Sequence, residues 1–248
     1  MRSEKEVKVL GIVPARGGSK GIPRKNIIDL AGKPLIAHTI QTAHQASLLD
    51  ACIVSTDDIE IADVARKFGA DVPFLRPAEL AQDNSTDIGF MQHAIDWVAE
   101  HRQWKPDILV MLQPTSPTRT PDDIDSVIRI MVDKNADSVR TVVDPSPHNP
   151  FKMWTFIDDE GRMKPLLPTE YFDTLGTDVP RQKLPKYFLQ IGFVYATRVS
   201  LLRQGKVIGP RMFGYVIPRE RLVDIDSYED LARAESIMAA HDLNSQTD

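Results

Sequence analysis

The segment from Ala15 to Asn26 combines three glycines with four basic side chains. Glycines let backbone N–H groups approach an anion closely, and a polyphosphate needs such contacts together with fixed positive charge. The segment fits neither the Walker A pattern nor the GxGxxG dinucleotide fingerprint. The alternative is a flexible turn with solvated lysines. We interpret the segment as a binding loop for a nucleoside triphosphate, in which the cations are Arg16, Lys20, Arg24 and Lys25.

A second group that could do chemistry is the pair Asp224 and Asp226, which one residue separates. In an extended segment this spacing places both carboxylates on one face. Paired carboxylates beside phosphates suit Mg²⁺, which takes oxygen ligands and usually keeps several waters. The alternative is that Asp226 only helps to cap the last helix. We predict a Mg²⁺ site at this pair.

Two further polar segments could contact a second substrate. Gln113 follows an apolar run and could hydrogen-bond a polyhydroxylated ligand, although the prolines and hydroxyl residues around it could also form a simple turn. Arg181 and Gln182, with Lys152 upstream, could hold a carboxylate, because arginine binds carboxylates in bidentate fashion. The alternative is a solvated arm. Asp57 and Asp58 are more typical of helix caps than of catalysts.

Short apolar runs alternate with amphipathic segments, and this alternation indicates the elements that must position these groups. It is typical of an α/β protein with a mostly parallel sheet covered on both faces. Ligands of such sheets bind beyond the carboxyl ends of the strands, so the polar loops there should converge on one crevice. The expected strands are Val9–Val13, Ala51–Ser55, Asp71–Leu75, Ile108–Leu112, Ser138–Val143, Gly192–Ala196 and Phe213–Ile217. The expected helices are Leu35–Ala46, Glu60–Phe68, Ile88–Glu100, Asp122–Lys134 and Ser227–Ala240, with Ser227 as an N-cap. The converging loops are Pro14–Asn26, Thr56–Asp58 and Gln113–Thr120.

The pattern changes after Asp144, where prolines and charges replace the alternation. We therefore expect one domain over residues 1–248, with an arm at 145–190 inserted in it. The net charge of −5 gives no basic surplus for nucleic acid. No apolar stretch reaches the roughly 20 residues that span a bilayer. The single cysteine, Cys52, suits a reducing compartment. We expect a cytoplasmic protein without nucleic-acid or membrane partners.

Taken in order, these segments resemble the acylneuraminate (CMP-sialic acid) synthetase family of cytidylyltransferases, which includes enzymes for other nonulosonic acids. The loop Ala15–Asn26 resembles the family signature ARxGSKGxPxKN, and Val223–Asp226 resembles its DID motif. The likeness runs from Lys8 to Met238. The other matching segments are Leu75–Ala81 (LRPxELA), Leu112–Arg119 (LQPTSPLR, with Thr118 in place of leucine) and Pro180–Pro185 (PRQxLP).

The resemblance implies a Rossmann-like three-layer fold of the nucleotide-diphospho-sugar transferase type. It implies Mg²⁺-dependent transfer of CMP from CTP to the anomeric hydroxyl of an acidic 2-keto sugar, with release of pyrophosphate. It also implies that the arm makes a homodimer or a dimer of dimers. The implied catalytic residues are Arg16, Lys25, Asn26 and Asp226. The implied CTP contacts are Ala15, Arg16, Gly17, Ser19, Lys20, Lys25, Arg76, Asn84 and Ser85. The implied sugar contacts are Gln113, Lys152, Arg181, Gln182 and Gln190, and Asp224 and Asp226 would carry the metal.

The sugar itself is less well specified than the nucleotide. Leu189 and Ile191 stand where sialic acid synthetases often have polar residues. We rank a nonulosonate such as sialic, legionaminic or pseudaminic acid first. The alternatives are a cytidylyltransferase for Kdo or a phosphonate and, more remotely, a non-catalytic nucleotide-binding module, which would not need an intact charged loop and carboxylate pair.

Overall fold

The computed structural model describes residues 7–146, 148–167 and 184–245. These residues form two compact units. The described part of the first is 7–142 and 190–245, and that of the second is 143–146, 148–167 and 184–189. We describe each unit by itself.

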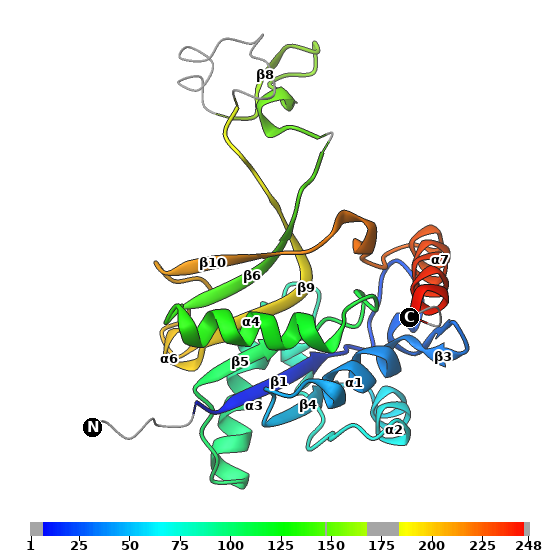
Figure 1. Cartoon of the computed structure of the whole chain (residues 1–248), viewed down its shortest axis with the longest axis vertical. Helices are drawn as coiled ribbons and strands as arrows, with labels where there is room; N and C mark the ends of the chain where they lie inside the picture. The colour runs from blue at the N-terminus through cyan, green and yellow to red at the C-terminus, as the bar shows by residue number, and fades with distance from the viewer. Residues whose placement is uncertain (1–6, 147, 168–183, 246–248) are drawn as a thin grey trace. The chain divides into compact units, whose positions relative to one another are not determined.

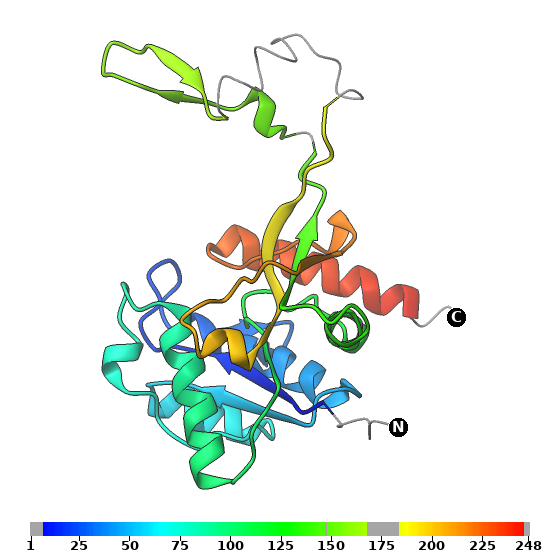
Figure 2. The same cartoon turned by 90° about the vertical axis from the view of Figure 1, so that its left-hand side faces the viewer.

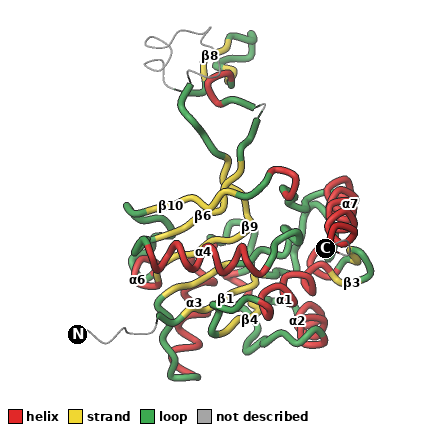
Figure 3. Tube along the Cα trace, viewed as in Figure 1, coloured by secondary structure: helices red, strands yellow, loops and turns green. Residues whose placement is uncertain are grey.

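The first unit is built on a six-stranded sheet with the order β10-β6-β9-β5-β1-β4 (Figures 1 and 3). β1 pairs in parallel with both β4 and β5, and β10 pairs in parallel with β6, whereas β9 runs antiparallel to β5. The predicted α/β class with a mostly parallel sheet is therefore confirmed. The strands are β1 (Val9–Pro14), β4 (Ala51–Ser55), β5 (Ile108–Met111), β6 (Ser138–Val143), β9 (Leu189–Arg198) and β10 (Met212–Val216).

The central strands are buried on both faces, which explains their unbroken apolar sequences. The expected strand Asp71–Leu75 is wrong. This stretch makes only isolated bridges to β4 and its end, Ile53 to Asp71 and Thr56 to Leu75. Pro73 lies between the two bridges, and a proline has no N–H to donate to a ladder.

Helices cover both faces of the sheet. α3 and α6 pack on one face, where Leu10 and Leu109 belong to the same core cluster as Ile95 of α3 and Leu202 of α6. α1 and α4 contact each other, and Figure 2 shows α4 on the opposite side of the sheet from α3. The three-layer prediction is thus confirmed. The helices are α1 (Leu35–Gln45), α2 (Ile59–Lys67), α3 (Asp87–His101), α4 (Pro121–Asp133), α6 (Val199–Leu202) and α7 (Tyr228–Ser245). The sequence pattern did not predict the short α6.

The helix starts follow local capping chemistry. Thr120 and Asp123 form a capping box at the start of α4, with Pro121 in its first turn. Asp58 caps α2 by accepting a hydrogen bond from the Ile61 N–H, so its predicted role as a cap is confirmed. The Ser227 hydroxyl accepts from the Asp230 N–H before α7, which confirms the predicted N-cap.

A second core cluster lies under α7. Ile22 of the basic loop and Leu30, four residues after its end, are buried with Val223 and Ile225 against Ala234 of α7. Burial of these apolar side chains joins two stretches of chain about 200 residues apart. Nearby are the short strands β2 (Asp29–Leu30) and β3 (Lys33–Pro34) and the 3-10 helices Lys25–Ile27, Ala78–Leu80 and Arg219–Arg221.

The second unit contains an antiparallel hairpin. β7 (Trp154–Phe156) pairs with β8 (Met163–Pro165), and a 3-10 helix at Pro150–Lys152 precedes it. Several large apolar side chains of this unit are exposed, namely Met153, Trp154, Phe156, Ile157, Met163 and Leu166. In neither unit is a described helix both long and apolar enough to cross a bilayer.

Candidate active site

A pocket of about 290 Å³ opens where β1 and β5 end in the first unit. Two of the three polar loops expected to converge line it, and Asp226 joins them from the segment before α7. The predicted residues that line it are Arg16, Ser19, Lys20, Lys25, Asn26, Arg76, Gln113 and Asp226. Its other lining residues are Pro14, Gly21, Asp87, Phe90, Pro114 and Thr115.

The third polar loop, Thr56–Asp58, is absent from this lining and supports the basic loop instead. The Gly17 N–H donates to Asp57 Oδ1 at 3.0 Å. Arg24 forms ion pairs with Asp58 and with Glu60, and the hydrogen bond from Arg24 is the main cause that lowers the pKa of Asp58. Arg24 therefore stabilises the fold through these ion pairs. It does not line the pocket, although the sequence pattern suggested that it would bind phosphate.

Lys25 connects the loop to the acidic segment. Its Nζ lies 2.7 Å from Asp226 Oδ1 and 2.7 Å from the Ile225 carbonyl oxygen. The Lys25 side chain is only 14% exposed, whereas that of Asp226 is 78% exposed. Asp226 thus does not cap α7 with its side chain, and its carboxylate lies at the pocket next to a shielded ammonium group.

The two remaining loop cations share one carboxylate. Arg16 Nη1 lies 3.1 Å from Asp83 Oδ1, and Lys20 Nζ lies 2.9 Å from Asp83 Oδ2. The hydrogen bond from Lys20 is the main cause that lowers the pKa of Asp83. The sequence analysis did not single out Asp83, because nothing in the spacing marks it as a partner of residues more than 60 positions earlier.

Asn26 and Arg76 form the buried part of the pocket. The Asn26 amide donates to the Arg16 carbonyl at 2.9 Å and so fixes the loop backbone. Arg76 donates from Nε to Ser55 Oγ at 3.0 Å and from Nη2 to the Ser55 carbonyl at 2.6 Å. Its guanidinium lies 4.4 Å from the centre of the Phe90 ring. Burial lowers the pKa of Arg76 to about 10.

The carboxylate pair keeps the alternation that its spacing predicts. Val223 and Ile225 are buried while Asp224 and Asp226 are exposed, and the Ile225 N–H donates to the Thr115 carbonyl at 2.9 Å. Partial desolvation by the groups around it raises the pKa of Asp224 although the residue keeps contact with solvent, and a hydrogen bond from the Thr115 side chain opposes that rise. No group of three or more His, Cys, Asp or Glu side chains suited to a metal occurs in the described ranges. Asp226 lines the pocket, whereas Asp224 is not among its lining residues. The exposed Asp226 carboxylate suits Mg²⁺, because this ion prefers oxygen ligands and takes most of the others from phosphates and water.

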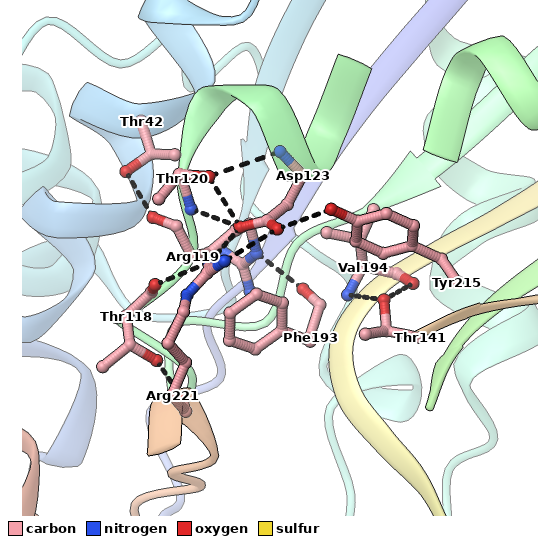
Figure 4. Close-up of polar contacts among 10 residues, drawn as sticks. All are labelled: Thr42, Thr118, Arg119, Thr120, Asp123, Thr141, Phe193, Val194, Tyr215 and Arg221. Carbon is pink, nitrogen blue, oxygen red and sulfur yellow. Dashed lines mark hydrogen bonds and ion pairs between the residues drawn. The ribbon is translucent and has the colours of Figure 1, made fainter. Parts of the chain in front are cut away.

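Arg119 stabilises the turn after β5. The sequence pattern had marked it only as the last residue of the LQPTSPLR-like segment. Arg119 is 4% exposed and donates from Nε to the Phe193 carbonyl at 2.6 Å and from Nη2 to the Gln113 carbonyl at 2.7 Å. Figure 4 shows the neighbouring ion pair of Asp123 with Arg221. Burial lowers the pKa of Arg119 to about 9. Thr118 donates to the Arg221 carbonyl at 2.7 Å, so its hydroxyl links this turn to the 3-10 helix Arg219–Arg221.

Several predicted contacts lie elsewhere. The Ala15 N–H donates to the Ser55 carbonyl, and neither Ala15 nor Gly17 lines the pocket. Ser85 lies in an adjoining hollow of about 250 Å³ that also contains Arg16, Arg76 and Phe90, whereas Asn84 lines neither space. Gln190 donates to the Tyr195 hydroxyl at 3.2 Å, outside the pocket. Lys152 belongs to the second unit, and Arg181 and Gln182 lie outside the described residues.

The sequence analysis missed Asp87, Phe90 and Thr115, which also line the pocket. Phe90 lies in α3 among core residues and carries the same periodic signal as they do. Thr115 could have been found from its place two residues after Gln113 in the turn. Asp87 is in the first turn of α3, where an acidic residue is common for helix stability alone.

Comparisons with known proteins identify the family of the chain and its fold. Residues 10–153 match the family model of the cytidylyltransferases. The chain is 36% identical to CMP-N,N'-diacetyllegionaminic acid synthase of Legionella pneumophila, over 94% of this chain and 97% of the relative. It is 30% identical to pseudaminic acid cytidylyltransferase of Campylobacter jejuni, over 92% and 95%. A solved structure of CMP:2-keto-3-deoxy-manno-octonic acid synthetase with CTP is 19% identical and has a TM-score of 0.67, over 94% of this chain and 99% of that one. This similarity also confirms the predicted fold class.

Proposed function

The chain belongs to the cytidylyltransferase family, and from that premise we propose that it transfers CMP from CTP to the anomeric hydroxyl of a nonulosonic acid and releases pyrophosphate. The observation that carries the proposal is the single pocket in which the loop cations and Asn26 face Gln113 and Asp226. Cations on one side suit a triphosphate, and an amide on the other suits a hydroxylated acceptor.

The chemistry is an in-line attack of the acceptor oxygen on the α-phosphorus, with pyrophosphate as the leaving group. Such a transfer depends on positioning and on neutralising the phosphate charge. Arg16 and Lys20 would exchange Asp83 for phosphate oxygens, since their ion pairs lie at the solvent-exposed rim. Lys25 would neutralise charge near the reacting phosphate, and Asn26 would keep the loop backbone in place. Asp224 and Asp226 would hold Mg²⁺, which supplies further charge neutralisation when bound.

The base is proposed to lie beside Arg76 and Phe90, where the main pocket meets the adjoining hollow near Ser85. The acceptor is proposed to contact Gln113. A nonulosonate is favoured over Kdo because the relatives at 30–36% identity act on nonulosonic acids by name, whereas the Kdo synthetase likeness at 19% identity concerns the fold alone. Lys152, Arg181, Gln182 and Gln190 remain proposals as acceptor contacts.

The second unit is proposed to form a homodimer, alone or as a pair of dimers. Its exposed apolar side chains, such as Phe156 at 67% and Met163 at 49%, are better buried against a protein surface than left in water. Light scattering after size-exclusion chromatography tests this, with Phe156→Ser expected to weaken the dimer. We also place the enzyme in the cytoplasm, which suits its free thiol at Cys52.

The decisive experiment is pyrophosphate release with Mg²⁺ and each of CTP, UTP, ATP and GTP. Each nucleotide is paired with N-acetylneuraminic, N,N'-diacetyllegionaminic and pseudaminic acids, with Kdo and with a small phosphonate. We expect release with CTP and a nonulosonate, and its loss in EDTA. Release with CTP and Kdo or the phosphonate alone would overturn the acceptor. Absence of CTP binding to the folded protein would overturn the role of the loop Ala15–Asn26.

A further inference from the structure

Gln113 has an unusual position among the residues of the pocket. It is half-buried and lines the pocket, yet its side-chain amide makes no hydrogen bond to any residue in the described ranges. Its backbone carbonyl, by contrast, accepts from Arg119. The amide therefore carries hydrogen-bonding groups that no described residue uses, and its direction depends on what packs against it.

The group that packs against the amide is Gly192 of β9. A Cβ atom at position 192 would lie 1.8 Å from Gln113 Oε1 and 3.0 Å from Gln113 Cδ. Real Cβ contacts of this length do not occur. Gly192 is not among the glycines with positive φ, so its backbone conformation suits any residue. What requires glycine at position 192 is therefore the space taken by the Gln113 amide.

The backbone around this contact is held on both sides. Arg119 bridges the carbonyls of Phe193 and Gln113, at 2.6 and 2.7 Å, and is buried. Figure 4 shows Arg119 reaching Phe193. Ser116 Oγ donates to the Gly192 carbonyl at 3.3 Å. Because these bonds fix β9 relative to the turn, a side chain added at 192 cannot be accommodated by separating the two segments. The Gln113 side chain must rotate instead.

We propose that Gly192 is a positioning residue for the acceptor: its missing side chain, together with the Arg119 clamp, sets the direction of the Gln113 amide toward the acceptor's hydroxyl groups. This rests on the proposed function, in which Gln113 contacts the acceptor. It also makes position 192 a determinant of acceptor specificity, since a larger residue there would turn the amide and change which hydroxyls it reaches.

The test is Gly192→Ala, assayed with whichever of N,N'-diacetyllegionaminic, pseudaminic and N-acetylneuraminic acid the wild type uses best. A misdirected hydrogen bond should raise the acceptor KM by about tenfold. The Kd for CTP should change by less than about twofold, because the basic loop holds the phosphates. The matched control is Gly214→Ala on β10, where a Cβ would meet only Val142 Cγ2, at 3.3 Å, as its nearest neighbour. It should leave both constants unchanged.

Gln113→Ala separates this inference from the proposed function. In that background the clash is gone, so adding Gly192→Ala should neither raise the acceptor KM further nor lower the Tm. The proposal is overturned if Gly192→Ala raises the KM equally with and without Gln113, or if it leaves the KM unchanged while Gln113→Ala raises it. If Gln113→Ala itself leaves the acceptor KM unchanged, the acceptor role of Gln113 fails and the positioning role fails with it.

Discussion

The two walls of the pocket hold their positive charge in opposite ways. On the loop wall, Arg16 and Lys20 share Asp83, and the Lys20 side chain is 73% exposed. On the turn wall, Arg119 does not line the pocket itself; it is 4% exposed and donates to the Phe193 and Gln113 carbonyls and not to a carboxylate. One wall carries charge at the rim of the molecule, and the other carries it inside.

This difference separates basic side chains that are able to exchange their protein partner for a ligand from basic side chains that stabilise the fold. An exposed ion pair contributes roughly 0–1 kcal/mol, so a phosphate can replace Asp83 at little cost. A buried guanidinium cannot leave its carbonyl partners without the loss of these hydrogen bonds, which costs roughly 1–3 kcal/mol where a buried group is left unpaired. Lys25 is intermediate, because it is shielded yet still faces the exposed carboxylate of Asp226.

The largest effect that would test this comparison is expected at Lys25. We expect Lys25→Ala to reduce kcat by about 10²–10³-fold, the range found when one preorganised donor to a developing charge is removed. Asp226→Ala should also collapse turnover. Lys33→Ala, which removes only a bond to Gln41 outside the pocket, serves as the control in the pyrophosphate assay. Near-normal turnover of Lys25→Ala would show that Lys25 does not neutralise the phosphate charge of the ligand.

The next effect concerns the interior wall. Arg119→Ala should lower the free energy of unfolding by about 3 kcal/mol, since it removes the buried donor to the Phe193 and Gln113 carbonyls and to Thr39 Oγ1. For a chain of this size, Tm should then fall by roughly 6–12 °C in calorimetry. Arg203→Ala removes an exposed ion pair with Asp96 and should leave Tm nearly unchanged. A Tm of Arg119→Ala equal to that of the wild type would show that the Arg119 hydrogen bonds do not stabilise the fold.

The smallest effect is expected at Asp83. Asp83→Asn removes the carboxylate that competes with phosphate for Arg16 and Lys20, so the Kd for CTP should fall by up to about fivefold. Titration calorimetry measures this. Asp63→Asn, which breaks an exposed pair with Arg66, is the matched control. A rise in the Kd would contradict the comparison, because it would mean that Asp83 helps to hold the nucleotide or the loop.

The sheet and the basic loop could be predicted because their signals are local. The apolar run of β5 and the capping residues of α4 act over a few positions, and both were predicted close to their observed bounds. The strand prediction at Asp71–Leu75 was wrong because it relied on the apolar residues of this stretch. It did not take into account that Pro73 has no N–H to donate to a neighbouring strand. α6 was missed because one turn of helix carries no periodic signal.

The sequence by itself determined which residue types are available: a glycine-rich basic loop, a pair of aspartates and a polar turn after a buried strand. The tertiary structure decided which of them face the pocket. Arg24 pairs with Asp58, 34 residues away, and does not line the pocket. Its neighbour Lys25 pairs at the pocket with Asp226, 201 residues away. The space that Gly192 leaves for Gln113 likewise joins β9 to the turn after β5. Such pairings depend on how the sheet brings its strands together, because contacts between distant residues leave no periodic pattern in the chain.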